Sequence, residues 1–305
     1  MFEHIAPVFY YLEIHLLFAS IVWFAAWILT SIQHGHSATT KYWIWVATSV
    51  NFILPMGAVL DKLWASHLSW ATPIGLIGEL GLVISRNALV VVVWFLGATF
   101  MLVRLCLRIR ADHRQRPAQS ALDTNMSLLA DGVQVRFAAS GQAPAVDGVL
   151  RPHISLPNGI DQLLSKDELE AVLLHELTHA RRHDNLIRLI HEVSVCVLWF
   201  HPLVWITGSR LALYRELSCD ESVIRSAHGR NLVSALAKLA NPETEFLLQA
   251  SASSFISHRL AQLAAAQPAR ACRGASALLT VVFGAVLLAG VFATVSHTAC
   301  CFVHK

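Results

Sequence analysis

Four apolar segments, each about as long as a bilayer is thick, constrain the fold of this chain more than any other feature. They lie near Leu12–Ile32, Tyr42–Leu60, Ala88–Leu107 and Ala275–Val295. A helix needs about 20 predominantly apolar residues to cross the hydrocarbon core. The composition agrees, because charged residues make up only 14% of the 305 residues, whereas a soluble domain carries about 25%. The sequence therefore predicts an α-helical membrane protein with four transmembrane helices.

The positions of the basic residues predict which side of the membrane holds the polar part of the chain. Cytoplasmic loops carry an excess of Lys and Arg. We therefore expect three segments: residues 1–107 as a membrane domain with three helices, 108–273 as a cytoplasmic domain, and 274–305 as a fourth helix with a short external tail. The arginines that flank the cytoplasmic segment are Arg104, Arg108, Arg110, Arg114, Arg116, Arg259, Arg270 and Arg273.

Two shorter apolar features refine this topology. Val193–Ile206 lies inside the predicted cytoplasmic domain and is too short for an easy crossing. We expect either a helix that dips into the cytoplasmic leaflet or a buried core helix, and either would tie the domain to the membrane surface. Tyr42, Trp43 and Trp45, at the start of the second apolar segment, indicate an aromatic belt at the membrane interface.

The polar domain contains the run His175-Glu-Leu-Thr-His179. Residues four apart lie on one face of a helix, so both imidazoles can reach one metal ion, with Glu176 beside the open position. Ser165 and Glu168 form a capping box that starts such a helix. The pattern predicts one Zn²⁺ per chain and a catalytic glutamate that takes a proton from water. The alternative is a helix with two solvated histidines.

Spacing leaves more than one candidate for the third metal ligand. His183 lies about 12 Å along the helix from His175, too far to share one ion with it. Glu216, on a later helix, has enough intervening chain for a helical hairpin to return it, and His191 and His201 are further candidates. Asp220 would share the face of Glu216 and could hold the second nitrogen of a ligand histidine. The alternative for the two acids is a solvated acidic face.

Short strand-like runs precede the metal motif, at Val133–Phe137, Ala143–Leu150 and residues 153–156. Pro152 and Pro157 bracket the last run and favour an edge strand, because a central strand could not spare those donors. An edge strand could hold an extended substrate by strand addition. The substrate-binding residues predicted on this basis are His153, Ile154, Ser155 and Leu156.

Together the capping box, H-E-L-T-H-A-R-R-H-D, the apolar His-Pro-Leu-Val-Trp hairpin and E-L-S-C-D-E resemble the BlaR/MecR-type membrane metallopeptidases. The resemblance is sharpest from about Pro144 to Val223. It implies an α+β zincin-like (gluzincin) peptidase domain in the cytoplasm, between the third and fourth helices of a bacterial inner-membrane protein. By it, the histidine ligands are His175 and His179, the glutamate ligand is Glu216, and the general base is Glu176.

The resemblance implies a zinc metalloendopeptidase in regulated proteolysis or signal transduction, which cleaves a transcriptional repressor or itself. The alternatives are a proteolytically inactive signalling scaffold, and a peptidase of membrane-protein quality control or prenyl-protein processing. The expected partners are the lipid bilayer and a protein substrate, and pairing into a homodimer is left open. The formal charge of +3 is small and argues against a direct nucleic-acid partner.

The chain departs from the antibiotic sensors of that family after the fourth apolar segment. In those receptors an extracellular penicillin-binding domain follows, whereas here only Ser296–Lys305 follow. We therefore expect no β-lactam sensing. Cys300 and Cys301 in this tail could bind a soft metal or respond to oxidants, although incidental residues in a disordered tail are the plainer interpretation.

Overall fold

The computed structural model describes residues 6–32, 37–53, 88–114, 131–138 and 143–239. The predicted fourth helix, Ala275–Val295, and the tail with Cys300 and Cys301 lie outside the described residues. The described elements are, in order, α1 (Ala6–Ile32), α2 (Ala38–Asn51), α5 (Ala88–Arg114), β1 (Val135–Ala138), β2 (Ala145–Asp147), β3 (His153–Pro157), α7 (Ile160–Leu163), α8 (Lys166–Arg181), α9 (Asp184–Val197), α10 (Pro202–Arg225) and α11 (Gly229–Leu239).

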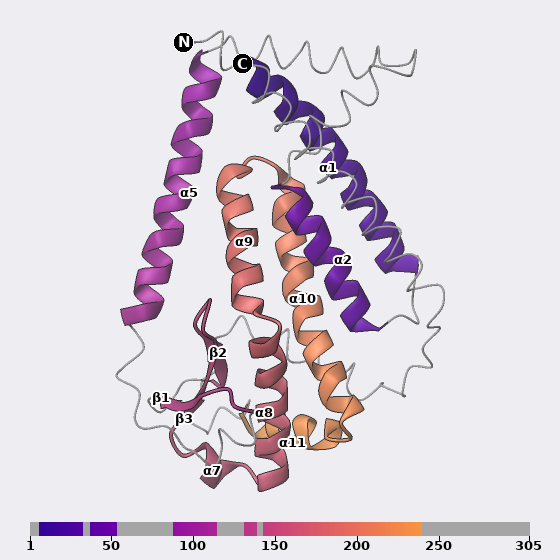
Figure 1. The fold of residues 1–305 in the computed structure, drawn as a ribbon, viewed down its shortest axis with the longest axis vertical. Coiled ribbons are helices and arrows are strands. Elements are labelled where there is room, and N and C mark those ends of the chain that lie inside the picture. The colour runs from indigo at the N-terminus through magenta and orange to yellow at the C-terminus, as the bar shows by residue number, and fades with distance from the viewer. Residues whose placement is uncertain (1–5, 33–36, 54–87, 115–130, 139–142, 240–305) are drawn as a thin grey trace, which may run out of the picture.

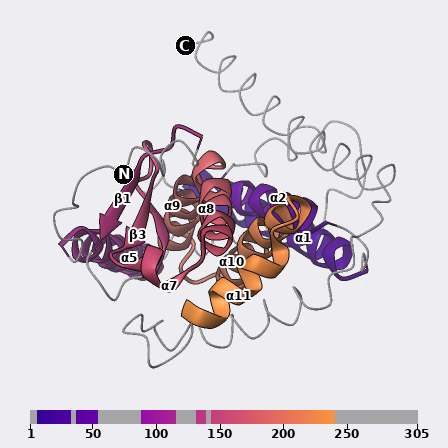
Figure 2. The ribbon, with the colours of Figure 1, turned by 90° about the horizontal axis from the view of Figure 1, so that it is seen from below.

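Figure 1 shows two regions along the long axis of the molecule. Helices α1, α2, α5 and α9 occupy one region, the strands lie with α7, α8 and α11 at the other end, and α10 runs from the first region to the second beside α8. Seen from below in Figure 2, α8 lies between the sheet on one side and α10 and α11 on the other. Within the described residues the chain is mostly helical with one small sheet, as the sequence predicted.

Among the described residues, α5 contains the one helical stretch long and apolar enough to cross a membrane, the 23 residues Leu89–Ala111. Most of its large apolar side chains are exposed, including Phe95 and Phe100 at 63% and 64%, whereas Leu105 is buried. Helix α1 contains a shorter apolar stretch, His15–Ser31, and α2 has 14 residues. An exposed apolar helix suits a lipid environment. The number of transmembrane helices stays a prediction.

Helix α2 packs against α10 through two of its aromatic residues. Tyr42 and Trp45 are fully buried in an apolar cluster that includes Leu198 and Val204, whereas Trp43 is 42% exposed. The prediction of an aromatic belt is therefore wrong for Tyr42 and Trp45. Residues three apart share a helix face, and here that face lies against protein.

The start of α2 is fixed by a side chain from α10. The Glu221 carboxylate accepts hydrogen bonds from the backbone N–H of Thr39 at 3.0 Å and from the hydroxyls of Ser37 and Thr39 at 2.9 and 3.0 Å. A negatively charged carboxylate at the N-terminal end of a helix also interacts favourably with the helix dipole. Helix α2 of the predicted membrane domain and helix α10 of the predicted cytoplasmic domain thus contact each other through both apolar and polar side chains.

Helices α9 and α10 form a hairpin whose turn lies against α5. The Trp94 indole donates to the carbonyl of Val197 at 3.0 Å, and the Trp199 indole donates to the carbonyl of Trp94 at 3.3 Å. Gly97 leaves room for the second indole, because a Cβ there would lie 2.2 Å from the Trp199 ring. Pro202 begins α10 at a position where its missing N–H costs nothing.

Replacing this glycine is expected to weaken the contact between α5 and the hairpin. Gly97→Leu should lower stability by about 1–3 kcal/mol through overpacking, which outweighs the helix propensity of up to about 1 kcal/mol that leucine adds. Thermal unfolding of the full chain in detergent measures the effect. Thr99→Leu, at an exposed position of the same helix, is the control. Equal melting temperatures for the two variants would show that the contact does not stabilise the fold.

The sheet places β3 between the other two strands. β1 pairs with it in parallel, with Val135 opposite Ile154, and β2 pairs with it antiparallel, with Val146 opposite Ile154. The prediction that residues 153–156 form an edge strand is therefore wrong. Pro157 is the last residue of the strand and Pro152 precedes it, so the missing N–H groups fall where the ladder begins and ends.

The central position of β3 bears on the predicted substrate contacts. Strand addition needs a free backbone edge. The strand pairs with β1 from Ile154 to Pro157 and with β2 from His153 to Ser155, and Ile154, Ser155 and Leu156 are buried. A substrate cannot pair with Ile154 and Ser155, at the middle of this strand, without displacing β1 or β2.

Helix α8 begins at the predicted capping box, which the structure confirms. The Ser165 hydroxyl accepts from the backbone N–H of Glu168 at 3.3 Å, and the Glu168 carboxylate accepts from the N–H of Ser165 at 2.7 Å. On α11, Lys238 and Ser234 donate to the same carboxylate at 2.7 and 2.6 Å. Lys238, with Ser234 and Ser165, lowers the pKa of Glu168 to about 2. One carboxylate thus caps α8 and fixes α11 against it.

Candidate metal centre

Two histidines on α8 and one glutamate on α10 turn their side chains toward one point. The Nε2 atoms of His175 and His179 lie 3.2 Å apart, and the Glu216 carboxylate oxygens lie 3.6 and 3.8 Å from these two nitrogens. Ligand atoms of a tetrahedral zinc ion, bound at 2.0–2.2 Å, are roughly 3.3 Å apart. The three donors therefore have the spacing and the chemical type that one zinc ion requires.

The other ring nitrogen of each histidine faces a buried aspartate. His175 Nδ1 lies 3.1 Å from Asp220 Oδ1, and His179 Nδ1 lies 2.7 Å from Asp184 Oδ2. The two aspartates are 2% and 4% exposed. A carboxylate in this position accepts the imidazole N–H, which keeps the proton on Nδ1 and leaves the Nε2 lone pair for a metal. The hydrogen bond to Asp184 thus holds His179 in the tautomer that metal binding needs, and Asp220 lies within reach of the same nitrogen of His175.

Asp184 is itself fixed by two further donors. Arg182 donates to its Oδ2 at 2.6 Å, and the Tyr42 hydroxyl donates to its Oδ1 at 2.6 Å. Burial opposes ionisation, but the hydrogen bonds from His179 and Arg182 outweigh it and lower the pKa of Asp184. Since Tyr42 belongs to α2, the predicted membrane domain contributes directly to the support of the candidate metal centre.

Glu216 is oriented by its neighbour in sequence. The Arg215 guanidinium donates to Glu216 Oε1 through two nitrogens, at 3.0 and 3.1 Å. Burial alone would raise the pKa of Glu216, but the contacts with His175, His179 and Arg215 outweigh it and hold the pKa well below its ordinary value. The carboxylate is therefore ionised, as a metal ligand must be.

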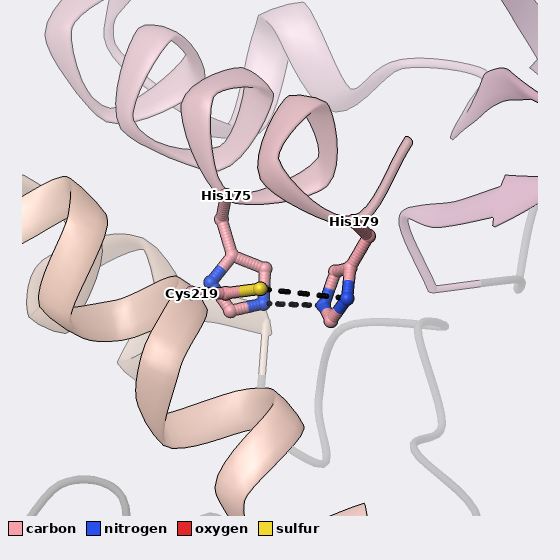
Figure 3. A group of neighbouring side chains, drawn as sticks. All are labelled: His175, His179 and Cys219. Carbon is pink, nitrogen blue, oxygen red and sulfur yellow. Dashed lines mark hydrogen bonds between the residues drawn. The ribbon is translucent and has the colours of Figure 1, made fainter. Parts of the chain in front are cut away.

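Cys219 is a competing ligand in the same place. Figure 3 shows its thiol, from α10, beside the two imidazoles from α8, and the ligand atoms lie within 4.8 Å of one another. However, Sγ lies 3.4 Å from His179 Nδ1, the nitrogen that faces Asp184, and 2.9 Å from an Arg182 nitrogen. Burial raises the pKa of this thiol well above its ordinary value, although Arg182 opposes the shift. We therefore favour Glu216 as the third ligand.

The other histidines considered from the sequence lie away from this point. His183 is an exposed residue with left-handed backbone between α8 and α9. His191 Nδ1 lies 2.9 Å from the hydroxyl of Ser49, and His201 Nε2 lies 3.4 Å from that of Ser20. The residues that the structure does bring together are His175, Glu176, His179, Glu216 and Asp220, with Glu176 8% exposed beside the two histidines on α8.

Sequence reasoning missed four residues that support this centre: Tyr42, Arg182, Asp184 and Arg215. Asp184 had a sequence signal, since it follows His179 by five residues and ends the H-E-L-T-H-A-R-R-H-D run. The helix breaks at His183, so the next helix starts beside the first. Tyr42 had no such signal, because only the packing of α2 on α10 brings it near.

Removing either supporting aspartate is expected to weaken metal binding without abolishing it. Asp220→Ala and Asp184→Ala should each lower zinc affinity by about 10- to 100-fold, because the freed imidazole loses its fixed tautomer and orientation. Competition with a chelating dye measures the affinity. Asp161→Ala, an exposed acid on α7, is the control and should bind zinc as the wild type does. An unchanged affinity in both variants would exclude a supporting role.

Similarity to known proteins extends over much of the chain. The sequence model of the family described as BlaR1 peptidase M56 matches residues 77–263, more than half of the chain. Regulatory protein BlaR1 of Bacillus licheniformis is 41% identical over 85 residues, 28% of this chain and 14% of that protein. The methicillin resistance mecR1 proteins of Staphylococcus aureus and Staphylococcus epidermidis are 26% identical over 93 residues, 30% of this chain and 16% of theirs.

These alignments cover much less than two thirds of the relatives' own length. The family match is broader, and it includes α8 and α10, the helices that bring the two histidines and the glutamate together. The resemblance inferred from the motifs is therefore confirmed: this chain belongs to the BlaR1 peptidase M56 family.

Proposed function

We propose that this protein is a zinc-dependent metalloendopeptidase of the bacterial inner membrane, with its peptidase domain on the cytoplasmic face. The observation that carries the proposal is the convergence of two imidazole Nε2 atoms and the Glu216 carboxylate beside the buried Glu176. Three protein ligands leave a fourth position for water. A zinc ion bound there would polarise that water and act as a Lewis acid toward the scissile carbonyl.

The remaining chemistry falls to the side chains of this chain. Glu176 takes a proton from the attacking water, whose oxygen bonds to the carbonyl carbon, and delivers that proton to the leaving amine nitrogen as the C–N bond breaks. Asp184 and Asp220 keep the imidazole protons on Nδ1 throughout. Arg215 holds the Glu216 carboxylate in place.

The membrane setting proposed here has four transmembrane helices and a hairpin that enters the bilayer. At 1.5 Å per residue, Trp94 lies about 25 Å along α5 from Ala111. Since the hairpin turn contacts Trp94, and the hydrocarbon core is about 30 Å thick, a membrane-crossing α5 carries the turn past the midplane. Exposed Phe200 and Trp205, at 44% and 42%, would then contact lipid. This is deeper than the dip into one leaflet expected from the sequence.

We further propose that the substrate is a protein cleaved in regulation, such as a transcriptional repressor or the enzyme itself. The support is the similarity to a protein named as regulatory and to proteins named for methicillin resistance. We expect the substrate to be held at the bilayer surface. Arg104 and Arg108, near the end of the apolar stretch of α5, line one cavity with Asp184 and Arg215, which support the candidate centre.

Comparison of protein N-termini in cells that carry the wild type or Glu176→Gln tests this function. We expect one or a few cytoplasmic or self-derived termini to disappear in the variant, with accumulation of the uncut protein. Many membrane-protein termini lost at once would favour a quality-control peptidase. No change at all, in a protein that still binds zinc, would favour a signalling scaffold and overturn the proposal.

A further inference from the structure

A cavity of about 580 Å³ lies between α5, α9 and α10. It is distinct from the point where the two histidines and Glu216 converge, since none of these three lines it. Pockets that bind small ligands commonly enclose about 300–1,000 Å³. The cavity is therefore large enough for a ligand, and its walls come from the apolar helix α5, from the hairpin and from Tyr42 of α2.

The lining of the cavity changes from apolar to cationic in one direction. The hairpin turn lies beside Trp94, and Arg108 lies beside Glu192 farther from the turn, so α5 and α9 run antiparallel (Figure 1). In the direction away from the turn, the lining passes from Met101 to Arg104 and Arg108 on α5, from Val195 to Arg188 on α9, and from Trp205 to Arg215 on α10. Each of the three helices thus contributes apolar lining toward the turn and at least one arginine farther from it, and α9 adds the carboxylates of Glu192 and Asp184.

Positive charge exceeds negative charge at the cationic end. Glu192 is shared, because its Oε1 lies 3.5 Å from both an Arg108 nitrogen and an Arg188 nitrogen. In the part of the chain that the structure describes, no carboxylate pairs with Arg104, which is exposed. Arg215 and Asp184 also line this end, but they pair with Glu216 and Arg182 respectively. The guanidiniums of Arg104, Arg108 and Arg188 therefore face the single carboxylate of Glu192. Arg guanidinium is the group best matched to phosphate oxygens.

We propose that this cavity binds one anionic phospholipid of the bilayer. The phosphate headgroup lies against Arg104, Arg108 and Arg188, and the first part of an acyl chain lies along Met101 and Trp205. An amphiphile with this orientation matches the gradient on all three helices, and the arginines lie at the end of the apolar stretch where headgroups are found. The proposal rests on the membrane setting of the proposed function, and it does not require proteolysis.

The far end of the cavity reaches the support of the candidate metal centre. Asp184 and Arg215 both line it, and they contact His179 and Glu216 respectively. A molecule bound in the cavity would therefore contact side chains that themselves contact two of the three proposed metal ligands. The lipid would stabilise the packing of α5 on the hairpin and, through it, the position of these two supporting side chains.

Native mass spectrometry of the full chain, carrying Glu176→Gln to prevent self-cleavage, tests the proposal. Phosphatidylglycerol and phosphatidylcholine with the same acyl chains are titrated separately. We expect one phosphatidylglycerol to bind at least about tenfold more tightly than phosphatidylcholine. Arg104→Gln/Arg108→Gln/Arg188→Gln should lose that preference. The charge-matched control Arg110→Gln/Arg151→Gln/Arg230→Gln, at exposed positions outside the cavity lining, should keep it.

A second variant and a soluble probe separate the remaining outcomes. Ser209→Trp fills the cavity without changing charge and should also remove the tightly bound lipid. Equal binding of the two lipids by the wild type, or unchanged preference in both cavity variants, would overturn the proposal. So would displacement of the lipid by millimolar inorganic phosphate, which would identify a soluble anion as the ligand. Thermal unfolding provides a readout independent of mass spectrometry. Phosphatidylglycerol should raise the melting temperature of the wild type but not that of either cavity variant.

Discussion

Glu176→Gln is expected to slow peptide cleavage by about a hundredfold to ten-thousandfold, because the amide cannot accept a proton from water and return it to the leaving amine. Glutamine has nearly the same shape, and the three proposed ligand atoms belong to other residues. Zinc content should therefore remain at one ion per chain. Turnover of a fluorogenic peptide library and metal analysis of the same detergent-solubilised sample measure the two quantities together.

The control for this variant lies on the same helix. Glu170→Gln removes a carboxylate that is 45% exposed and whose nearest partner, His228, lies 3.8 Å away. It should cleave at the wild-type rate. Full activity in Glu176→Gln would refute the assignment of the general base. Loss of zinc in that variant would instead give Glu176 a structural role, and the rate could not then be attributed to proton transfer.

What the sequence predicted well is local to one helix. Helix α8 begins where the capping box indicates, and its period alone puts His175 and His179 on one face. The return of Glu216 and Asp220 to that face required only that a hairpin of two helices follow, and the apolar run Val193–Ile206 with Pro202 indicated one. These inferences depend on periodicity and capping, which a short segment determines by itself.

What the sequence could not predict depends on contacts between distant segments. Pro152 and Pro157 look the same whether they flank an edge strand or a central one, and only the pairing of β1 and β2 on either side of β3 decides between the two. Tyr42 has the composition of a membrane-interface residue, yet its face of α2 packs on α10 and its hydroxyl reaches Asp184. In each case a tertiary contact overrode an interpretation that local chemistry favoured.

Glu216→Ala is expected to lower zinc affinity by more than about a hundredfold, beyond the 10- to 100-fold expected for a residue that only supports a ligand. Cys219→Ala should leave zinc affinity and cleavage close to wild type, because the thiol lies on the Nδ1 side of His179 and its raised pKa keeps it protonated. Dye competition measures both affinities, with Asp161→Ala as the unaffected reference.

Cobalt(II) in place of zinc distinguishes Glu216 from Cys219 as the third ligand in the wild-type protein. A thiolate ligand produces an intense near-ultraviolet charge-transfer band, whereas two imidazoles and a carboxylate do not. If the band is present and disappears in Cys219→Ala while Glu216→Ala retains metal, the ligand is Cys219, and Glu216 is left to pair with Arg215. Absence of the band, with loss of metal in Glu216→Ala, identifies Glu216 as the ligand. The experiment needs bound metal because a metal ion lowers the pKa of a thiol that it binds. The raised pKa of the Cys219 thiol in the metal-free protein therefore does not decide the question alone.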